Sequence, residues 1–355
     1  MKTKCFFCFV VLAFCANANA DLINFPICTN TADQGSPTIS GNVVVWEDSR
    51  SGDWSINGKD LATGQDFLVY SNPVNQFDPH LDPSISGNVV VWSNHLIGGV
   101  AEIYAYNLST GVEFVVSSNN DIQRRPSISG NVVVWDDFRS NNYDIYGYNL
   151  EAGTELPIFV GVENQMYVDI SGNIVVWQDF RNGTYPDIYG YDLITGNEFS
   201  VVVDDTYQSH PSISDNVVVW NEEGYGDVLD IYGKNLLTGE VFPICTNGAA
   251  QRWPVIDGDI VAWMDYRNGN WDIYGYDLAI GTEFPICTNG ARQDYPSVYG
   301  DVIVWQDLRA GNYDIYGAIY EAPVGVPEPS TIVLLFTGLI SMGWYFLRHK
   351  RYRRE

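Results

Sequence analysis

The chain has 355 residues, a formal net charge of −26 and 46% hydrophobic residues, so it is strongly acidic yet able to bury a large apolar core. This charge repels phosphate backbones and anionic lipids, which excludes a direct role on DNA or RNA. Its 11 Trp and 23 Tyr residues exclude a disordered chain, because disordered chains contain few aromatic residues.

Residues 1–20 are typical of a secretory signal peptide. Lys2 and Lys4 supply a positive start, residues 6–14 form a short apolar run, and Ala18-Asn19-Ala20 offers a small-residue cleavage site after Ala20. We therefore expect the protein to be exported across the inner membrane.

A repeated unit fills the chain from about residue 21 to residue 321. Its most regular part, SGNVVVW and variants, ends at a tryptophan in each of seven copies spaced 42 to 46 residues apart. These residues are Trp46, Trp92, Trp135, Trp177, Trp220, Trp263 and Trp305. A period of this length is typical of one propeller blade, so the repeat predicts an all-β, seven-bladed β-propeller over residues 21–321.

Each unit has the pattern of four antiparallel strands joined by short turns. In the last unit we expect strands at Pro296–Tyr299, Val302–Trp305 and Asp314–Ala318, because runs of β-branched and aromatic residues are separated by Gly and Asn turns. In complete units a fourth strand follows, as at Glu240–Cys245.

The sequence FPICTN indicates how the ring closes. It occurs in fourth strands at Phe242–Asn247 and Phe284–Asn289, and again at Phe25–Asn30. The seventh unit has no fourth strand of its own, so Leu22–Thr29 is expected to supply it. A linear solenoid gives no reason for this split. The motif also holds the three cysteines that follow the leader, and this odd number at equivalent positions predicts free, half-buried thiols: Cys28, Cys245 and Cys287.

The loop after the tryptophan carries an Asp, an Arg and a second Asp in four units. Either the carboxylates hold calcium ions, or the arginine is held between the two carboxylates and pins the hairpin loop. Repetition in most blades favours the loop pin. The residues are Asp137, Arg139, Asp144; Asp179, Arg181, Asp187; Asp265, Arg267, Asp272; and Asp307, Arg309, Asp314.

Two further repeated positions are candidates for ligand binding. Aromatic residues in the same loop either form a stacking face for sugars or fill gaps between blades: Trp54, Tyr143, Tyr185, Trp271 and Tyr313. Glutamines ahead of the inner strand either cap loop groups or bind a ligand at the channel mouth: Gln34, Gln123, Gln165, Gln208, Gln251 and Gln293, with His80 in this place in the second unit.

Signals for catalysis are weak. The repeat region contains His80, His95 and His210, which occupy different places in their units. The sequence has no nucleophile elbow, His-x-x-x-His pair or Cys-x-x-Cys motif. We therefore expect a protein that is not an enzyme and needs no cofactor.

The C-terminal tail has three parts. A linker at 322–331 contains Pro327-Glu328-Pro329, an apolar run follows at 332–347, and a basic end occupies 348–355. The length of the run and the basic residues after it predict a transmembrane helix in the inner membrane with its end in the cytoplasm.

Different parts of the chain resemble two known families. The pattern W-x-D-x-R-x-G-N-x-D-I-Y, carried in the last unit from Trp305 to Tyr316, resembles the propeller repeat of TolB and its relatives over residues 22–320. The tail resembles the PEP-CTERM sorting signal, which implies processing by an exosortase and delivery to the cell surface or the exopolysaccharide matrix. A plain single-pass membrane anchor is the alternative for the tail.

These features together predict a surface-displayed or matrix-associated scaffold that binds a polysaccharide or a surface protein without catalysis. An extracellular carbohydrate-active enzyme, either a polysaccharide lyase or a hydrolase, is one alternative. A structural surface component without a discrete ligand is the other.

Overall fold

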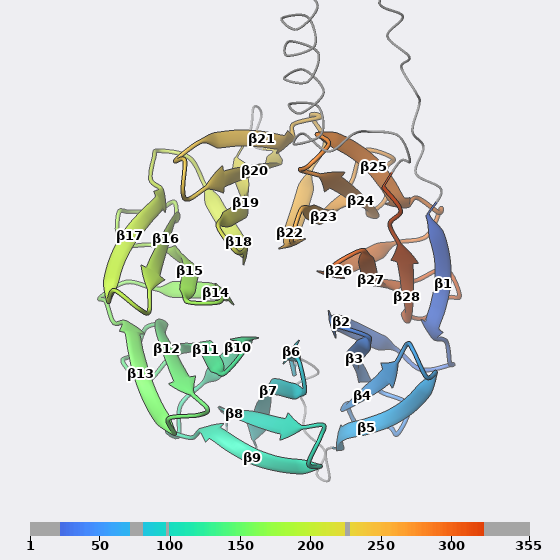
Figure 1. Cartoon of the computed structure of the whole chain (residues 1–355), viewed down its shortest axis with the longest axis horizontal. Coiled ribbons are helices and arrows are strands. Elements are labelled where there is room, and N and C mark those ends of the chain that lie inside the picture. The colour runs from blue at the N-terminus through green and yellow to red at the C-terminus, as the bar shows by residue number, and fades with distance from the viewer. Residues whose placement is uncertain (1–21, 72–80, 97–98, 224–227, 323–355) are drawn as a thin grey trace, which may run out of the picture. The chain divides into compact units, whose positions relative to one another are not determined.

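A computed structural model of the chain describes residues 22–71, 81–96, 99–223 and 228–322. These residues form seven four-stranded antiparallel sheets arranged as blades around a central axis (Figure 1). The predicted all-β, seven-bladed propeller is therefore confirmed. The signal peptide, the Pro327-Glu328-Pro329 motif and the transmembrane helix that the sequence predicts lie outside the described residues. Within the described ranges, no helix is long and apolar enough to cross a membrane.

Blades 1 to 6 are β2–β5, β6–β9, β10–β13, β14–β17, β18–β21 and β22–β25, and blade 7 combines β26–β28 with β1. The strands are β1 Ile23–Cys28, β2 Gln34–Ser40, β3 Val43–Asp48, β4 Ser55–Asp60, β5 Gln65–Ser71, β6 Ser84–Ser86, β7 Val89–Leu96, β8 Val100–Asn107, β9 Val112–Ser117, β10 Gln123–Ser129, β11 Val132–Asp137, β12 Asp144–Asn149, β13 Thr154–Phe159, β14 Gln165–Ser171, β15 Ile174–Asp179, β16 Asp187–Asp192, β17 Asn197–Val202, β18 Gln208–Ser214, β19 Val217–Glu223, β20 Leu229–Asn235, β21 Val241–Cys245, β22 Gln251–Asp257, β23 Ile260–Asp265, β24 Asp272–Asp277, β25 Thr282–Cys287, β26 Gln293–Tyr299, β27 Val302–Asp307 and β28 Asp314–Ile319.

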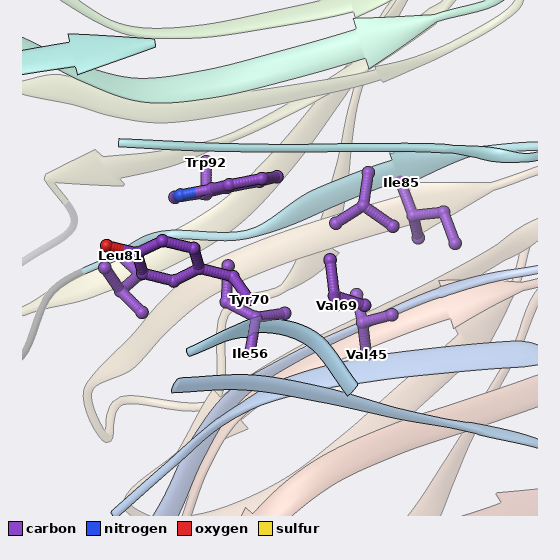
Figure 2. Packing of buried hydrophobic residues seen from close by; sticks show 8 residues of the cluster. Val45, Ile56, Val69, Tyr70, Leu81, Ile85 and Trp92 are labelled. Atoms are coloured by element: carbon purple, nitrogen blue, oxygen red, sulfur yellow. The ribbon is translucent and has the colours of Figure 1, made fainter. Parts of the chain in front are cut away.

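The hydrophobic core lies between neighbouring blades. The second strand of each blade is covered on both faces, which explains its continuous Val-Val-Trp run, and every repeat tryptophan is at most 1% exposed. Figure 2 shows one such contact, in which Val45 and Ile56 of blade 1 pack toward Ile85 and Trp92 of blade 2. Each blade therefore buries its apolar face against its neighbours.

Strand β1 completes the ring as the outermost strand of blade 7, next to β28 (Figure 1). Its register repeats that of the other FPICTN strands: Phe25 lies opposite Gly317, as Phe242 lies opposite Gly233 and Phe284 opposite Gly275. In each pair the phenylalanine ring occupies the space that a Cβ on the glycine would need. The shared sequence therefore reflects one shared packing environment.

Neighbouring blades are also joined by hydrogen bonds at the turn after each inner strand. A side chain at the end of one inner strand accepts a hydrogen bond from a backbone N–H of the following blade. The pairs are Ser40 with Gly87, Ser86 with Gly130, Ser129 with Gly172, Ser171 with Asp215, Ser214 with Gly258 and Asp257 with Gly300, at 2.7–3.0 Å. Tyr299 takes this position in blade 7, where the seam to blade 1 includes hydrogen bonds from the Ser36 backbone to Gln306 and from the Gln34 backbone to the Tyr313 carbonyl.

The inner strand of blade 7 is longer than expected. The sequence places it at Pro296–Tyr299, whereas β26 begins at Gln293 and includes a bulge between Asp294 and Ser297. The residue within the bulge, Tyr295, has a φ of 49°. A residue before proline is normally extended, so Pro296 resembles the start of a strand in the sequence. The left-handed Tyr295 instead forms a bulge, and the strand continues through it.

Candidate functional site

The inner strands of all seven blades surround a central channel with a volume of about 1080 Å³. One end of this channel is lined by the bulge residues of the inner strands, which we call the mouth residues. They are Ser36, Asp82, Arg125, Tyr167, His210, Trp253 and Tyr295, one from each blade in chain order.

All seven mouth residues have left-handed backbones, with φ between 46° and 56°. This conformation costs a residue other than glycine about 1–2 kcal/mol, and most of all a bulky one. None of the seven is glycine or asparagine, although either would reduce the strain. Strain that is kept at one position around a channel is typical of a functional site.

The backbone of the mouth residues is held from the neighbouring blade. In four blades, the residue after the repeat tryptophan extends its side chain to the inner strand of the next blade, where it accepts hydrogen bonds from backbone N–H groups. Examples are Glu47 to Asp82 at 2.9 Å, Asn221 to Trp253 at 3.2 Å and Gln306 to Ser36 at 3.1 Å. These contacts fix the direction in which each mouth side chain leaves the strand.

Four successive blades contribute an aromatic arc to the mouth, formed by Tyr167, His210, Trp253 and Tyr295. The His210 ring lies 4.1 Å from the Tyr167 ring and 4.1 Å from the Trp253 ring, measured between centroids. Trp253 is in turn 5.4 Å from Tyr295, which remains 39% exposed. The Arg125 guanidinium continues the arc 4.2 Å above the Tyr167 ring.

Two titratable groups of the mouth are shifted toward their neutral forms. Burial, and then the charges of Arg125 and Arg252, lower the pKa of His210 to about 3, so its imidazole is uncharged at neutral pH. Burial, and then the charge of Asp82, raise the pKa of Glu47 to about 8.

The five aromatic residues expected to form a stacking face do not form a common platform. Trp54 and Tyr313 line the channel, whereas Tyr143 lies beneath the Arg124 guanidinium and Trp271 packs against Tyr266. Tyr185 is 52% exposed. Among the described residues, no ring contact joins two of the five. The structure instead brings together the mouth aromatics, which the sequence analysis did not single out.

A signal for the mouth residues is nevertheless present in the sequence. They occupy the position before the inner-strand proline, or before Val168 in blade 4. In a repeat whose other inner-strand positions change little, this position holds Ser, Asp, Arg, Tyr, His, Trp and Tyr. A position that varies between otherwise similar units indicates a side chain that is not needed for the fold.

The Asp-Arg loop differs in part from the expected arrangement. In four blades, the first aspartate accepts hydrogen bonds from the tryptophan indole and from the arginine, as in Asp307 with Trp305 at 3.0 Å and with the Arg309 backbone at 2.9 Å. The arginine does not bridge to the second aspartate. Where the arginine binds a second carboxylate, that carboxylate belongs to a residue of the fourth strand, as in the ion pair of Arg139 with Glu155 at 2.7 Å.

The second aspartate of the set has a separate role. Asp144 accepts hydrogen bonds from Asn142 at 3.1 Å and from the Gly161 backbone at 2.9 Å, which ties the hairpin loop to the connection toward the next blade. The other members are bonded in a similar way by neighbouring asparagine side chains: Asp187, Asp272 and Asp314. Each of these aspartates thus accepts at least one hydrogen bond from an N–H donor.

We predict that Arg309→Met destabilises the protein by roughly 2–3 kcal/mol at pH 7, because Asp307 is fully buried and loses its charged partner. Burial raises the pKa of Asp307, but hydrogen bonds from Arg309 and Trp305 outweigh it and hold this pKa below its usual value. The pair therefore stabilises the fold above the pKa of the unfolded aspartate, and its effect is lost as pH falls below that range. Thermal melts at pH 7 and pH 3 measure this, and an equal loss at both would contradict it.

The six predicted glutamines are buried. All are 0% exposed, and Gln34 is among the residues that line the channel. Gln251, for example, donates to Asn247 at 2.8 Å. His80, the equivalent residue of the second unit, lies outside the described residues.

The three cysteines are free, as expected, and each contacts the arginine of the next blade. The distances from Sγ to the guanidinium are 3.2 Å for Cys28, 3.3 Å for Cys245 and 3.2 Å for Cys287. Cys245 and Cys287 are buried, and Cys28 is half-buried. Burial raises the pKa of all three thiols, that of Cys287 to about 11.

We predict that native Cys245 and Cys287 resist alkylation, since reaction requires an accessible thiolate. Labelling of the native protein with iodoacetamide at pH 8, followed by peptide mass spectrometry, should modify Cys28 first and the other two only after denaturation. Rapid labelling of Cys287 in the folded protein would contradict the position assigned to it.

The histidines of the described part of the chain do not form a cluster. Its two histidines, His95 and His210, lie in different blades, and His95 is 3.4 Å from the Ser93 hydroxyl. No cluster of three or more His, Cys, Asp or Glu side chains within the described ranges is arranged to hold a metal ion.

Comparison with known proteins supports the fold. The propeller domain of the Trilobed protease from Pyrococcus furiosus has a TM-score of 0.62 at 13% identity, over 83% of this chain and 98% of that one. Oligogalacturonate lyase in complex with manganese has a TM-score of 0.57 at 13% identity, over 85% of this chain and 98% of that one. Acylaminoacyl peptidase from Pyrococcus horikoshii has a TM-score of 0.56 at 15% identity. The match covers 78% of this chain and only 49% of that one. No family model matches the sequence, and no curated protein is similar to it in sequence.

At these identities the likeness shows the fold alone. A structure described as TolB from Agrobacterium tumefaciens has a TM-score of 0.48, so the comparisons support the propeller and not the finer resemblance to TolB. The Trilobed protease domain is described as an open velcro propeller, whereas β1 closes the ring here.

Proposed function

We propose that the protein is a non-enzymatic propeller of the cell surface or extracellular matrix, and that it binds a sugar polymer at the mouth of its channel. The aromatic arc supports this proposal most directly. Tyr167, Trp253 and Tyr295 keep part of their rings accessible at the rim of a cavity, and flat apolar rings flanked by polar groups are typical of ligand sites. The exported body and the sorting tail predicted from the sequence fit a ligand in the surrounding matrix.

The properties of His210 support binding over catalysis. A general acid or base works best with a pKa near the operating pH, and the pKa of His210 is about 3. Its two ring nitrogens are also covered by its neighbours. We infer that His210 serves as a flat, uncharged surface of the arc.

Binding of soluble polysaccharides to the full chain, measured by affinity electrophoresis, tests this function. We expect Trp253→Ala/Tyr295→Ala to weaken binding by about tenfold or more, because each removed ring contributes on the order of 1 kcal/mol of contact. Tyr185→Ala, which removes an exposed ring outside the arc, is the control and should leave binding unchanged. Equal binding by both variants would contradict the site.

The alternative function is a carbohydrate-active enzyme. The likeness to oligogalacturonate lyase, which spans nearly all of that protein, is the observation that favours it. Accumulation of new reducing ends when the protein is incubated with a bound polysaccharide would establish this activity and replace the proposed binding role.

A further inference from the structure

The basic residues of the propeller are distributed unevenly. Residues 21–330 hold 11 Lys and Arg residues and 43 Asp and Glu residues, a charge of about −32. Five of the arginines bind the aspartate of their own blade loop: Arg50, Arg139, Arg181, Arg267 and Arg309. Lys59 and Lys234 donate to backbone carbonyls of outer strands. The other four lie in, or directly before, the inner strands of blades 3, 6 and 7: Arg124, Arg125, Arg252 and Arg292.

These four arginines are not fully neutralised. Arg124 and Arg125 share a single carboxylate, because their guanidinium nitrogens lie 3.8 and 3.3 Å from the same oxygen of the buried Asp136. Arg252 is exposed and forms no ion pair with any residue that the structure describes. Arg292 is balanced by Asp294. One side of the mouth therefore carries excess positive charge on a strongly acidic protein.

The excess charge lies beside the aromatic arc. Arg125 of blade 3 lies 4.2 Å above the Tyr167 ring. Arg252 of blade 6 directly precedes Trp253 in β22, and its guanidinium lies 5.4 Å from the Trp271 ring centroid. The charges of both arginines lower the pKa of His210. Ser36 and Asp82 complete the mouth; Asp82 is acidic, and its charge also acts on Arg125 of the next blade. A ligand that carries both rings and negative charge thus finds stacking surfaces and guanidinium groups within one site.

Building on the binding role above, we propose that the mouth takes an acidic polysaccharide, whose anionic groups lie between Arg125 and Arg252 while its sugar rings pack on Trp253 and Tyr295. Guanidinium groups bind carboxylate and sulfate through charge-assisted hydrogen bonds. Elsewhere the protein's negative charge repels the same polymer, so the mouth selects where it binds. The run of aromatic rings favours a sugar chain over an acidic peptide.

The test compares three polymers of similar length binding to the full chain: alginate with carboxylates, dextran sulfate with sulfates, and uncharged dextran. We expect an acidic polymer to bind at least about tenfold more tightly than dextran, and this preference to shrink in high salt. Comparison of the affinities for alginate and dextran sulfate shows whether the site prefers carboxylate or sulfate groups. Arg125→Gln/Arg252→Gln should weaken binding of the acidic polymer by about tenfold or more.

Lys59→Gln/Lys234→Gln is the matched control, because it changes the net charge by the same amount in the third strands of blades 1 and 5, away from the mouth, and should leave binding within about twofold. If the mouth double variant melts at a lower temperature, Arg252→Gln alone alters an exposed side chain and should still weaken binding. Dextran that binds as tightly as the acidic polymers, or acidic binding unchanged in both mouth variants, overturns this inference and leaves the binding role intact. Absence of binding to all three overturns both. Poly-glutamate that binds as tightly as alginate overturns the sugar specificity.

Discussion

A chain that lacks residues 22–29 is expected to melt roughly 10 °C below the intact chain. The deletion removes the buried Ile27, the Phe25 ring that covers Gly317, and every backbone hydrogen bond from β1 to the outer edge of β28. Together these contacts are worth on the order of 5 kcal/mol, and 1 kcal/mol corresponds to about 2 °C in a protein of this size. The exposed edge of β28 should also promote aggregation, because unpaired edges pair with other chains. Differential scanning calorimetry of the two chains measures the change.

The matched substitutions are Phe25→Ala and Phe242→Ala. Both phenylalanines are half-buried, and each ring covers the glycine opposite it on the neighbouring strand. If β1 is an equal member of its blade, the two variants should lose similar stability, about 2 kcal/mol each. A loss in Phe242→Ala without a loss in Phe25→Ala would show that the first strand does not hold the ring closed.

Most of the fold is predictable because the repeat is regular. The seven tryptophans count the blades, and the three copies of FPICTN indicate that the first strand belongs to the last blade. The length of the inner strand is not predictable in the same way. A residue before proline is normally extended, so Pro296 resembles the start of a strand, whereas a left-handed Tyr295 allows β26 to begin at Gln293.

The site is less predictable because it depends on contacts between blades. Glu155 becomes the partner of Arg139 only through the register of the fourth strand, which places Glu155 opposite Tyr148. The mouth residues come from positions far apart in the chain, and the packing of successive blades brings Tyr167, His210 and Trp253 into contact. The loop aromatics also share one place in the sequence pattern, but no ring contact among the described residues joins two of them.

Replacing Glu47 by glutamine is expected to stabilise the protein by on the order of 3 kcal/mol at pH 9, and to leave it unchanged at pH 4. Glu47 is 3% exposed and accepts hydrogen bonds from the backbone of Leu81 at 2.7 Å and Asp82 at 2.9 Å. Burial, and then the charge of Asp82, raise its pKa to about 8. The folded state therefore favours the protonated acid. Stability falls as pH rises from the unfolded pKa of about 4.5 through 8, and it is lowest where Glu47 is ionised.

A glutamine at this position keeps the acceptor oxygen and removes the charge, and the protein uses it elsewhere. Gln306 occupies the equivalent place in blade 7 and accepts a hydrogen bond from the Ser36 backbone at 3.1 Å. Gln306→Glu is thus the reciprocal variant, and it should lose stability as pH rises while Glu47→Gln gains relative to the intact protein. Thermal melts from pH 4 to pH 9 give the three curves. If the three curves of melting temperature against pH are parallel, Glu47 ionises as easily in the folded protein as in the unfolded one. In that case the carboxyl beside Asp82 adds a negative charge to the mouth at neutral pH.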